Sequence, residues 1–242
     1  MSADLHLVHL YPDLLRTYGD RGNIVALQKR AEWRGFAVEI TSVSRGDAVP
    51  TDASLILIGG GSDRVQEIIG PDILARGPEL ANAASHGVVV LGVCGGYQLL
   101  GHEYVAADGT AIQGLGLLDV TTGTGRGRII GRVNARAQID GRTFDLVGFE
   151  NHGGRTRLGS GATTLAVVPK GQGNNGVDRT EGAVQGSFFG TYLHGPVLPA
   201  NPELADALLE RALAKRLDGE PLKPLDDSLE EAAHRESRHR RR

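Results

Sequence analysis

The sequence predicts an α/β fold in which a mostly parallel sheet is flanked by helices and carries antiparallel additions. Two observations lead to this fold class. Over the first hundred residues, short apolar runs alternate with segments of helical periodicity, as in parallel strands joined by crossover helices. From about residue 114 to residue 168, glycine-rich turns instead separate short strand-like runs, which indicates antiparallel strands at an edge of the sheet.

The first half of the chain supplies the parallel strands. In chain order, we expect them over residues 5–10, 36–43, 53–61 and 88–93. Residues 23–35 have helical periodicity, with Asn23 as a suitable N-terminal cap. Residues 62–87 are expected to form helical pieces that break at Pro71 and Pro78.

The second half ends in a strand, a helix and a charged tail. Residues 182–198 predict a late strand, and residues 201–217 a helix that Asn201 would cap. We therefore assign residues 1–217 to one domain. Residues 218–242 place acidic residues before basic ones, which predicts a flexible tail, either a frayed helix or a disordered end.

Composition excludes several function classes. The net charge of −3 over 242 residues supplies no overall basic field to hold nucleic acid. No apolar run reaches the roughly 18–20 residues of a membrane span, and the first residues lack the features of a signal peptide. One cysteine cannot form an internal disulfide. These features predict a cytoplasmic enzyme or binding protein, and the sequence suggests no metal site.

That single cysteine, Cys94, lies in "VVVLGVCGGYQLLG", between a buried strand and the start of a helix. The pattern G-x-C-x-G is typical of a sharp strand-turn-helix elbow that exposes a nucleophile. The Gly95 N–H would point to where an oxyanion forms, and the helix start favours thiolate. The alternative is a small buried apolar side chain, but the flanking glycines favour a nucleophile.

A nucleophilic cysteine needs a base and oxyanion donors. His194, in "GTYLHGP", and His152, in "FENHGG", both follow apolar runs, and position alone leaves the choice between them open. "LILIGGGSD" ends another buried strand in free backbone N–H groups, of which we choose Gly60 to pair with Gly95. A phosphate cradle is the alternative, although the loop lacks the Lys and Ser/Thr of a Walker motif.

Together, "GVCGGYQLLG", "IGGGSD" and "GTYLHGP" resemble the class I, triad-type glutamine amidotransferases, which have a flavodoxin-like fold. Within that class the chain is similar to the cobyric-acid-synthase-like branch, and "YGDRGN" and "FENHGG" match the small glutaminase subunits of lipid II isoglutaminyl synthases. The resemblance covers residues 5 to 215.

The resemblance implies that Cys94 attacks the side-chain amide of glutamine and that His194 acts as the base. It also implies that Arg128, in "TGRGRIIG", binds glutamine, and a guanidinium suits an α-carboxylate. Ammonia would pass to a Mur-ligase-like partner of the MurT type in a heterodimer. That partner would use ATP and Mg²⁺ to amidate the D-glutamate of lipid II, while this subunit would need no cofactor.

One departure from the family pattern concerns the third catalytic group. Most triad-type members carry Glu two residues after the histidine, whereas this chain has His194-Gly195-Pro196. The site is therefore either a Cys-His dyad or takes its acid from elsewhere, with Glu150 and Asp20 as candidates. Two other functions stay open: a glutaminase for another acceptor, such as a corrinoid carboxylate, and an inactive regulatory module on the same fold.

Overall fold

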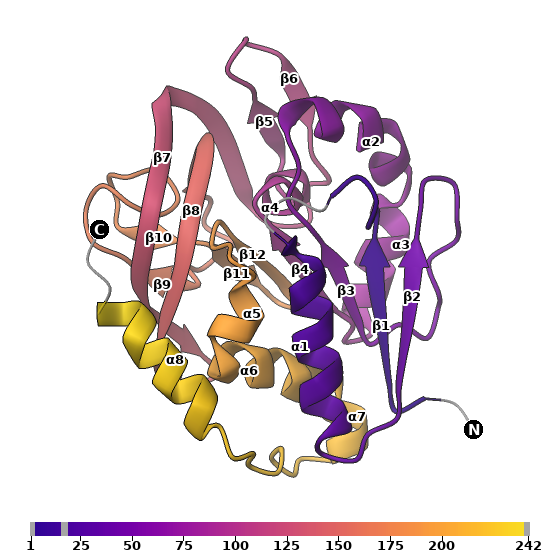
Figure 1. Cartoon of the computed structure of the whole chain (residues 1–242). Coiled ribbons are helices and arrows are strands. Elements are labelled where there is room, and N and C mark those ends of the chain that lie inside the picture. The colour runs from indigo at the N-terminus through magenta and orange to yellow at the C-terminus, as the bar shows by residue number, and fades with distance from the viewer. Residues whose placement is uncertain (1–2, 16–18, 240–242) are drawn as a thin grey trace.

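The computed structural model describes residues 3–15 and 19–239, and its centre is a six-stranded sheet (Figure 1). The sheet order is β11-β12-β4-β3-β1-β2. Every pairing is parallel except that between β11 and β12. In chain order, the strands are β1 (Leu5–Leu10), β2 (Val38–Val43), β3 (Leu55–Ile58), β4 (Val89–Val93), β11 (Ala183–Gln185) and β12 (Phe188–Thr191). This architecture confirms the predicted fold class.

The central strands are buried on both faces, as their continuous apolar sequences predict. Every residue of β1, β3 and β4 is buried. Two helices, α1 (Arg21–Glu32) and α6 (Pro202–Ala212), cover one face, and α2 (Asp63–Ala75) and α3 (Gly77–Ser85) cover the other. The carboxyl ends of the parallel strands consequently meet at one edge of a rigid core.

Two predictions about the helices are wrong. Helix α1 begins two residues before Asn23, whose buried side chain instead accepts a hydrogen bond from the Leu198 N–H. Pro71 lies inside α2 without ending it, and the break falls at Arg76, just before Pro78. Pro71 is nine residues into α2, so the rest of that helix keeps its hydrogen bonds and tertiary packing outweighs the local cost of the proline.

A second sheet has the order β10-β9-β7-β5-β6, with β8 paired to β7. Its members are β5 (Glu103–Val105), β6 (Ala111–Gln113), β7 (Val120–Ile139), β8 (Arg142–Leu158), β9 (Ala166–Val167) and β10 (Thr180–Glu181). The antiparallel pairing expected in this region is confirmed, but these strands form a separate sheet and do not extend the edge of the central one, and β7 and β8 are long strands where short runs were expected. Their glycines lie within the hairpin, and the β7 register shifts between Thr124 and Ile129. Such a bulge bends a strand without ending it.

The C-terminal third packs beside α1. After the short helix α5 (Val197–Ala200), the predicted helix divides at Leu213 into α6 and α7 (Ala214–Leu217). The charged tail forms helix α8 (Ser228–His239), which lies along α5 and β8 (Figure 1). Buried Arg30 bridges Asp206 and Asp227 at 2.6 and 2.7 Å, and so ties the tail to α1. The flexibility expected of this tail stays a prediction.

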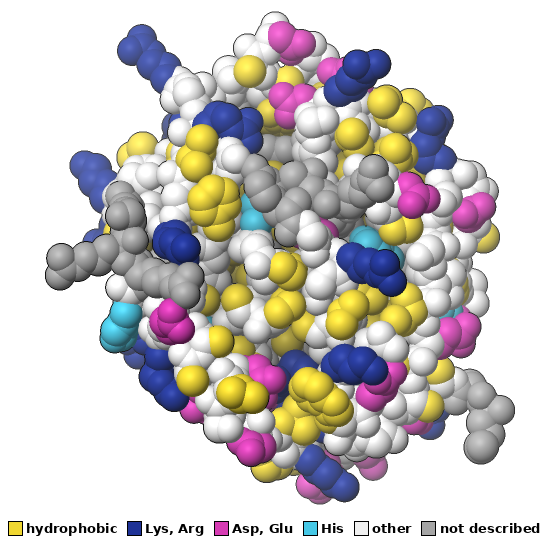
Figure 2. Space-filling view, viewed as in Figure 1, with side chains coloured by type: hydrophobic (Ala, Val, Ile, Leu, Met, Phe, Trp, Pro, Cys, Tyr) yellow, Lys and Arg dark blue, Asp and Glu magenta, His cyan; other side chains and the backbone are white. Residues whose placement is uncertain are grey.

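The surface of the protein mixes the two charge signs. On the face shown in Figure 2, basic and acidic side chains are interspersed among apolar and neutral ones. None of the helices in the described parts of the chain combines the length and the apolar character that a membrane crossing requires.

Candidate active site

Cys94 lies at a sharp elbow between β4 and α4 (Gly95–Leu100). Its backbone angles are φ 50° and ψ −101°, a conformation that side-chain-bearing residues rarely adopt. Backbone strain of this kind costs on the order of 1–3 kcal/mol and is concentrated at functional sites. The elbow predicted from G-x-C-x-G is therefore present.

The glycines around Cys94 are required by close backbone contacts. A Cβ atom on Gly96 would lie 2.1 Å from the Ile58 carbonyl oxygen, and one on Gly92 would lie 2.8 Å from the Gly96 carbonyl carbon. Any larger residue would force β3, β4 and α4 apart. The G-x-C-x-G pattern thus follows from the packing that holds the sulfur at the edge of the sheet.

Three of the predicted site residues converge on Gly60, which follows β3. A Cβ atom built there would lie 3.1 Å from His194 Cε1, 3.3 Å from Asp20 Oδ2 and 3.5 Å from Cys94 Cβ. A side chain on Gly60 would therefore press on the His194 ring and the Asp20 carboxylate. Residues separated by a hundred positions in the chain are thereby brought together at the carboxyl edge of the parallel sheet.

The electrostatics of this site favour a neutral thiol and a neutral imidazole. Burial raises the pKa of Cys94 to about 12, with a further contribution from Asp20, while the Gly95 N–H and Arg128 oppose the shift. Burial lowers the pKa of His194 to about 4, assisted by His152 and Arg128. A neutral imidazole is the form that can accept a proton, but burial disfavours the thiolate-imidazolium pair.

The Gly60 N–H donates a 2.5 Å hydrogen bond to Asp20 Oδ2 and is therefore not available to an oxyanion in this structure. Burial raises the pKa of Asp20 to about 6, although this hydrogen bond opposes the shift. The next glycine, Gly61, lines the site, and no residue in the described parts of the chain accepts a bond from its N–H. The Gly95 N–H lies near the Cys94 thiol and opposes the rise in its pKa.

The two candidate acids occupy different environments. Asp20 lies beside Gly60, at the point where Cys94 and His194 meet. Glu150 is buried elsewhere: its Oε2 accepts the Gly173 N–H at 2.8 Å and lies 3.7 Å from His152 Nε2. The His152 ring stacks on Tyr192 with ring centroids 3.7 Å apart. Asp20 is thus the candidate acid at the point of convergence, while Glu150 pairs with the rival histidine.

A cavity of about 230 Å³ opens over Cys94. Arg128 lines it from the irregular stretch of β7 between Thr124 and Ile129, and its side chain is otherwise exposed. Its guanidinium donates to the Asn151 side-chain and main-chain oxygens, both at 2.6 Å. The cavity therefore presents a fixed cation above the thiol.

The sequence did not single out several residues that line this cavity: Gly61, Ser62, Asp63, Gln98, Tyr104, Asn151 and Gly153. Two of them carried a usable signal. Asp63 directly follows the "IGGGS" strand end, and Gln98 lies one helical turn after Cys94. Within the described parts of the chain, no group of three His, Cys, Asp or Glu side chains could hold a metal ion.

Comparison with known proteins identifies the family. The model for the CobB/CobQ-like glutamine amidotransferase domain matches residues 6–202. The chain therefore belongs to this family of class I glutamine amidotransferases and is a glutamine-hydrolysing enzyme. The family resemblance read from the sequence motifs is confirmed.

Among curated proteins, the chain is 40% identical to the lipid II isoglutaminyl synthase (glutamine-hydrolyzing) subunit GatD of Staphylococcus aureus, across 91% of this chain and 88% of that protein. It is 39% identical to GatD of Streptococcus pneumoniae, across 88% of this chain and 82% of that protein. A cobyric acid synthase of Rhizorhabdus wittichii is 36% identical, across 72% of this chain and 35% of that protein.

Solved structures agree on the fold. One chain in the structure of PurLQS from Thermotoga maritima has a TM-score of 0.61 and 19% identity, covering 89% of this chain and all of its own. The glutaminase domain of Trypanosoma brucei CTPS, with bound acivicin, has a TM-score of 0.53 and 13% identity, covering 87% of this chain and 94% of that one. At these identities the likeness concerns the fold alone.

Proposed function

We propose that this protein is the glutaminase subunit of a lipid II isoglutaminyl synthase. It hydrolyses L-glutamine through a cysteine thioester and delivers ammonia to a Mur-ligase-like partner of the MurT type. In a heterodimer, that partner uses ATP and Mg²⁺ to amidate the D-glutamate of lipid II to D-isoglutamine. The similarity to GatD subunits along most of both chains supports the acceptor. The convergence of Cys94 and His194 at Gly60 supports the chemistry.

The reaction begins when His194 takes the Cys94 proton and the sulfur attacks the side-chain amide carbon of glutamine. The C–N bond then breaks, and the departing nitrogen receives the proton from His194 and leaves as ammonia. Water, deprotonated by the same imidazole, next attacks the thioester carbon. The C–S bond breaks, glutamate leaves, and His194 returns the proton to the Cys94 sulfur. In both steps Gly95 N–H stabilises the oxyanion.

We assign the second oxyanion donor to Gly61 rather than to Gly60. The Gly60 N–H is already engaged by Asp20, whereas Gly61 lines the cavity and its N–H has no partner within the described residues. A Cβ atom on Gly95 would lie 2.9 Å from the Gly61 nitrogen, so the two amides are neighbours. This proximity supports Gly61 as the second donor beside Gly95.

Asp20 is the acid we assign to this centre, and Arg128 is the residue that binds the α-carboxylate of glutamine. The Asp20 carboxylate lies close enough to Cys94 to raise the pKa of the thiol, so its charge disfavours the thiolate until an imidazolium balances it. Arg128 acts in the opposite direction and lowers the pKa of that thiol. Glutamine hydrolysis by the subunit alone should accordingly be slow and should rise when the partner binds.

The second candidate function is delivery of ammonia to a corrinoid carboxylate. The cobyric acid synthase relatives favour it, but this chain spans only 35% of the length of two of those proteins. It spans 88% and 82% of the two GatD subunits. The similarity along most of both chains therefore favours the lipid II function.

Ammonia release from glutamine, measured for the subunit alone and with its partner, tests the proposal. Replacing Cys94 by Ala or His194 by Asn should lower turnover at least about 10³-fold, because either change removes the shared proton-transfer step. Supplying lipid II or a corrinoid acid to the complex with ATP then distinguishes the two acceptors. Amidation of the corrinoid alone would overturn the proposed acceptor.

A further inference from the structure

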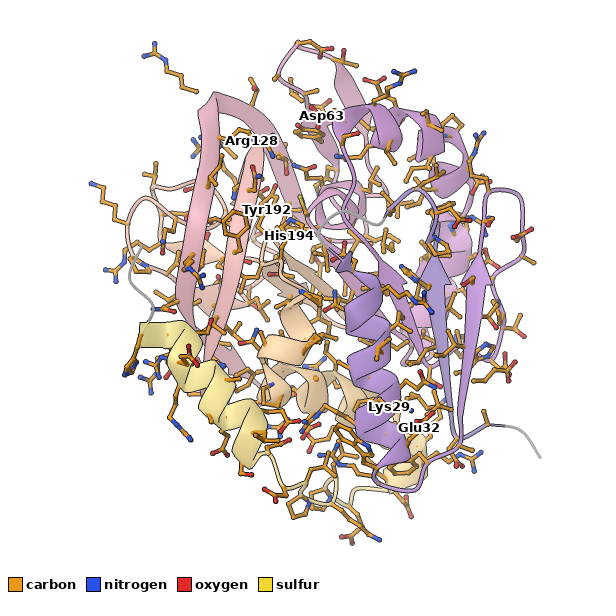
Figure 3. All side chains as sticks on the ribbon, in the orientation of Figure 1. Lys29, Glu32, Asp63, Arg128, Tyr192 and His194 are labelled. Atoms are coloured by element: carbon orange, nitrogen blue, oxygen red, sulfur yellow. The ribbon has the colours of Figure 1, made fainter. Side chains whose placement is uncertain are left out.

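The cavity over Cys94 carries two opposite charges that do not neutralise each other. Arg128 lines it from β7, and Asp63 lines it from the first residue of α2 (Figure 3). Within the described parts of the chain, neither side chain has an oppositely charged partner. Asp63 Oδ1 instead accepts a 3.0 Å hydrogen bond from the Tyr104 hydroxyl. Tyr104 thus holds a half-buried carboxylate near the nucleophile, and this hydrogen bond leaves the second oxygen of Asp63, Oδ2, available to a ligand.

Free glutamine has the complementary pair of charges. Its α-carboxylate matches Arg128, which leaves an α-ammonium group that needs acceptors once it is removed from water. Two amide oxygens of the cavity are already engaged, because Gln98 Oε1 accepts from Gln66 and Asn151 Oδ1 accepts from Arg128. Asp63 is the one carboxylate among the residues that line this cavity.

We propose that Asp63, oriented by Tyr104, binds the α-ammonium group of glutamine, so that the cavity selects a free, zwitterionic amino acid. This inference rests on the proposed glutaminase function and deepens it. Arg128 and Asp63 together fix the Cα end of the substrate, which aims the side-chain amide at the Cys94 sulfur. Glutamine inside a peptide lacks both charges at Cα and is excluded.

A purely structural role for Asp63 makes a different prediction. An acidic residue in the first turn stabilises its helix through the helix dipole, and Asp63 occupies that position in α2. Loss of that effect would weaken the binding of every ligand to the same extent and would disturb the elbow at Cys94. If Asp63 binds the ammonium group, its loss weakens the binding only of ligands that carry such a group.

The experiment compares Asp63→Asn with the wild type, in the presence of the partner, using three ligands. These are glutamine, glutaramate (which lacks the α-amino group) and 4-aminobutanamide (which lacks the α-carboxylate). The asparagine keeps an acceptor for Tyr104. The KM for glutamine and the inhibition constant for 4-aminobutanamide should rise about 10- to 100-fold, while the inhibition constant for glutaramate stays within about twofold.

Two controls separate this outcome from general damage. Glu67→Gln removes an exposed charge from the same helix and should leave the KM for glutamine within about twofold. Because Asp63 contributes to the raised pKa of Cys94, the Asp63→Asn thiol should react with iodoacetamide at least as fast as the wild type. The proposal would be overturned by an unchanged KM for glutamine, by an equal rise in the inhibition constant for glutaramate, or by slower labelling of the thiol. Failure of the proposed function would show separately, as no ammonia release by the wild type.

Discussion

Replacing Asp20 by Asn should stabilise the protein while impairing catalysis. The Asp20 side chain is fully buried, and burial raises its pKa from 3.8 to about 6. The folded state therefore penalises the carboxylate, and the free energy of unfolding falls as pH rises from about 4 through 6. A shift of about two pKa units corresponds to about 3 kcal/mol at pH 8.

Asparagine carries no charge at any pH and can still accept the Gly60 N–H. We therefore expect Asp20→Asn to gain about 1–3 kcal/mol at pH 8, because the weaker hydrogen bond offsets part of the benefit. For a chain of this size each kcal/mol raises Tm by about 2–4 °C. Near pH 5 the advantage should shrink to about half, since the wild-type carboxyl is then largely protonated in the fold.

Thermal unfolding at pH 5 to 8, followed by circular dichroism, measures this difference, and ammonia release measures the catalytic loss. Asp13→Asn, an exposed carboxylate in the same loop, is the control and should change Tm by less than about 2 °C. The reasoning is refuted if Asp20→Asn is no more stable than the wild type at pH 8. It is refuted equally if its advantage is the same at every pH.

Three further outcomes are expected. Gly96→Ala should lower the free energy of unfolding by about 3 kcal/mol or more, because its Cβ would meet the Ile58 oxygen, whereas Gly70→Ala, with open space around it, should be neutral or stabilising in chemical denaturation. Arg30→Met should lower the free energy of unfolding by about 3–5 kcal/mol and speed hydrogen exchange in α8. Lys29→Met breaks only an exposed ion pair and should lower it by less than about 1 kcal/mol. Equal effects would contradict the role of Arg30 in joining α1 to the tail. The partner should raise kcat for glutamine hydrolysis by at least about tenfold, because burial disfavours the ion pair of Cys94 and His194 in the subunit alone. Equal turnover with and without the partner would contradict this reasoning.

The sequence predicted those parts of the fold that depend on local pattern. The apolar runs at β1, β3 and β4 identify a buried parallel sheet, and G-x-C-x-G identifies the elbow at Cys94 because only glycines permit its backbone contacts. Asn23 failed as a cap because its side chain serves a distant segment, at Leu198. Such a contact across 175 positions leaves no trace in local composition.

The candidate site likewise contains residues that a local motif predicts and residues that only tertiary packing brings together. Cys94 and Gly95 follow from one motif, whereas the choice between Asp20 and Glu150 depends on tertiary packing. Both acids lie in motifs with neighbouring glycines, and only the fold sets Asp20 beside Gly60 and Glu150 against His152. The engagement of the Gly60 N–H by Asp20 likewise arises between residues 40 positions apart.

The most direct test of the central claim is covalent trapping of the nucleophile. A glutamine-mimicking diazo ketone should modify the wild-type protein once per chain, and peptide mass spectrometry should find the adduct on Cys94. His194→Asn should slow this labelling, and unlabelled glutamine should compete with it. An adduct on another residue, or undiminished glutamine hydrolysis after Cys94 is replaced by Ala, would contradict the account.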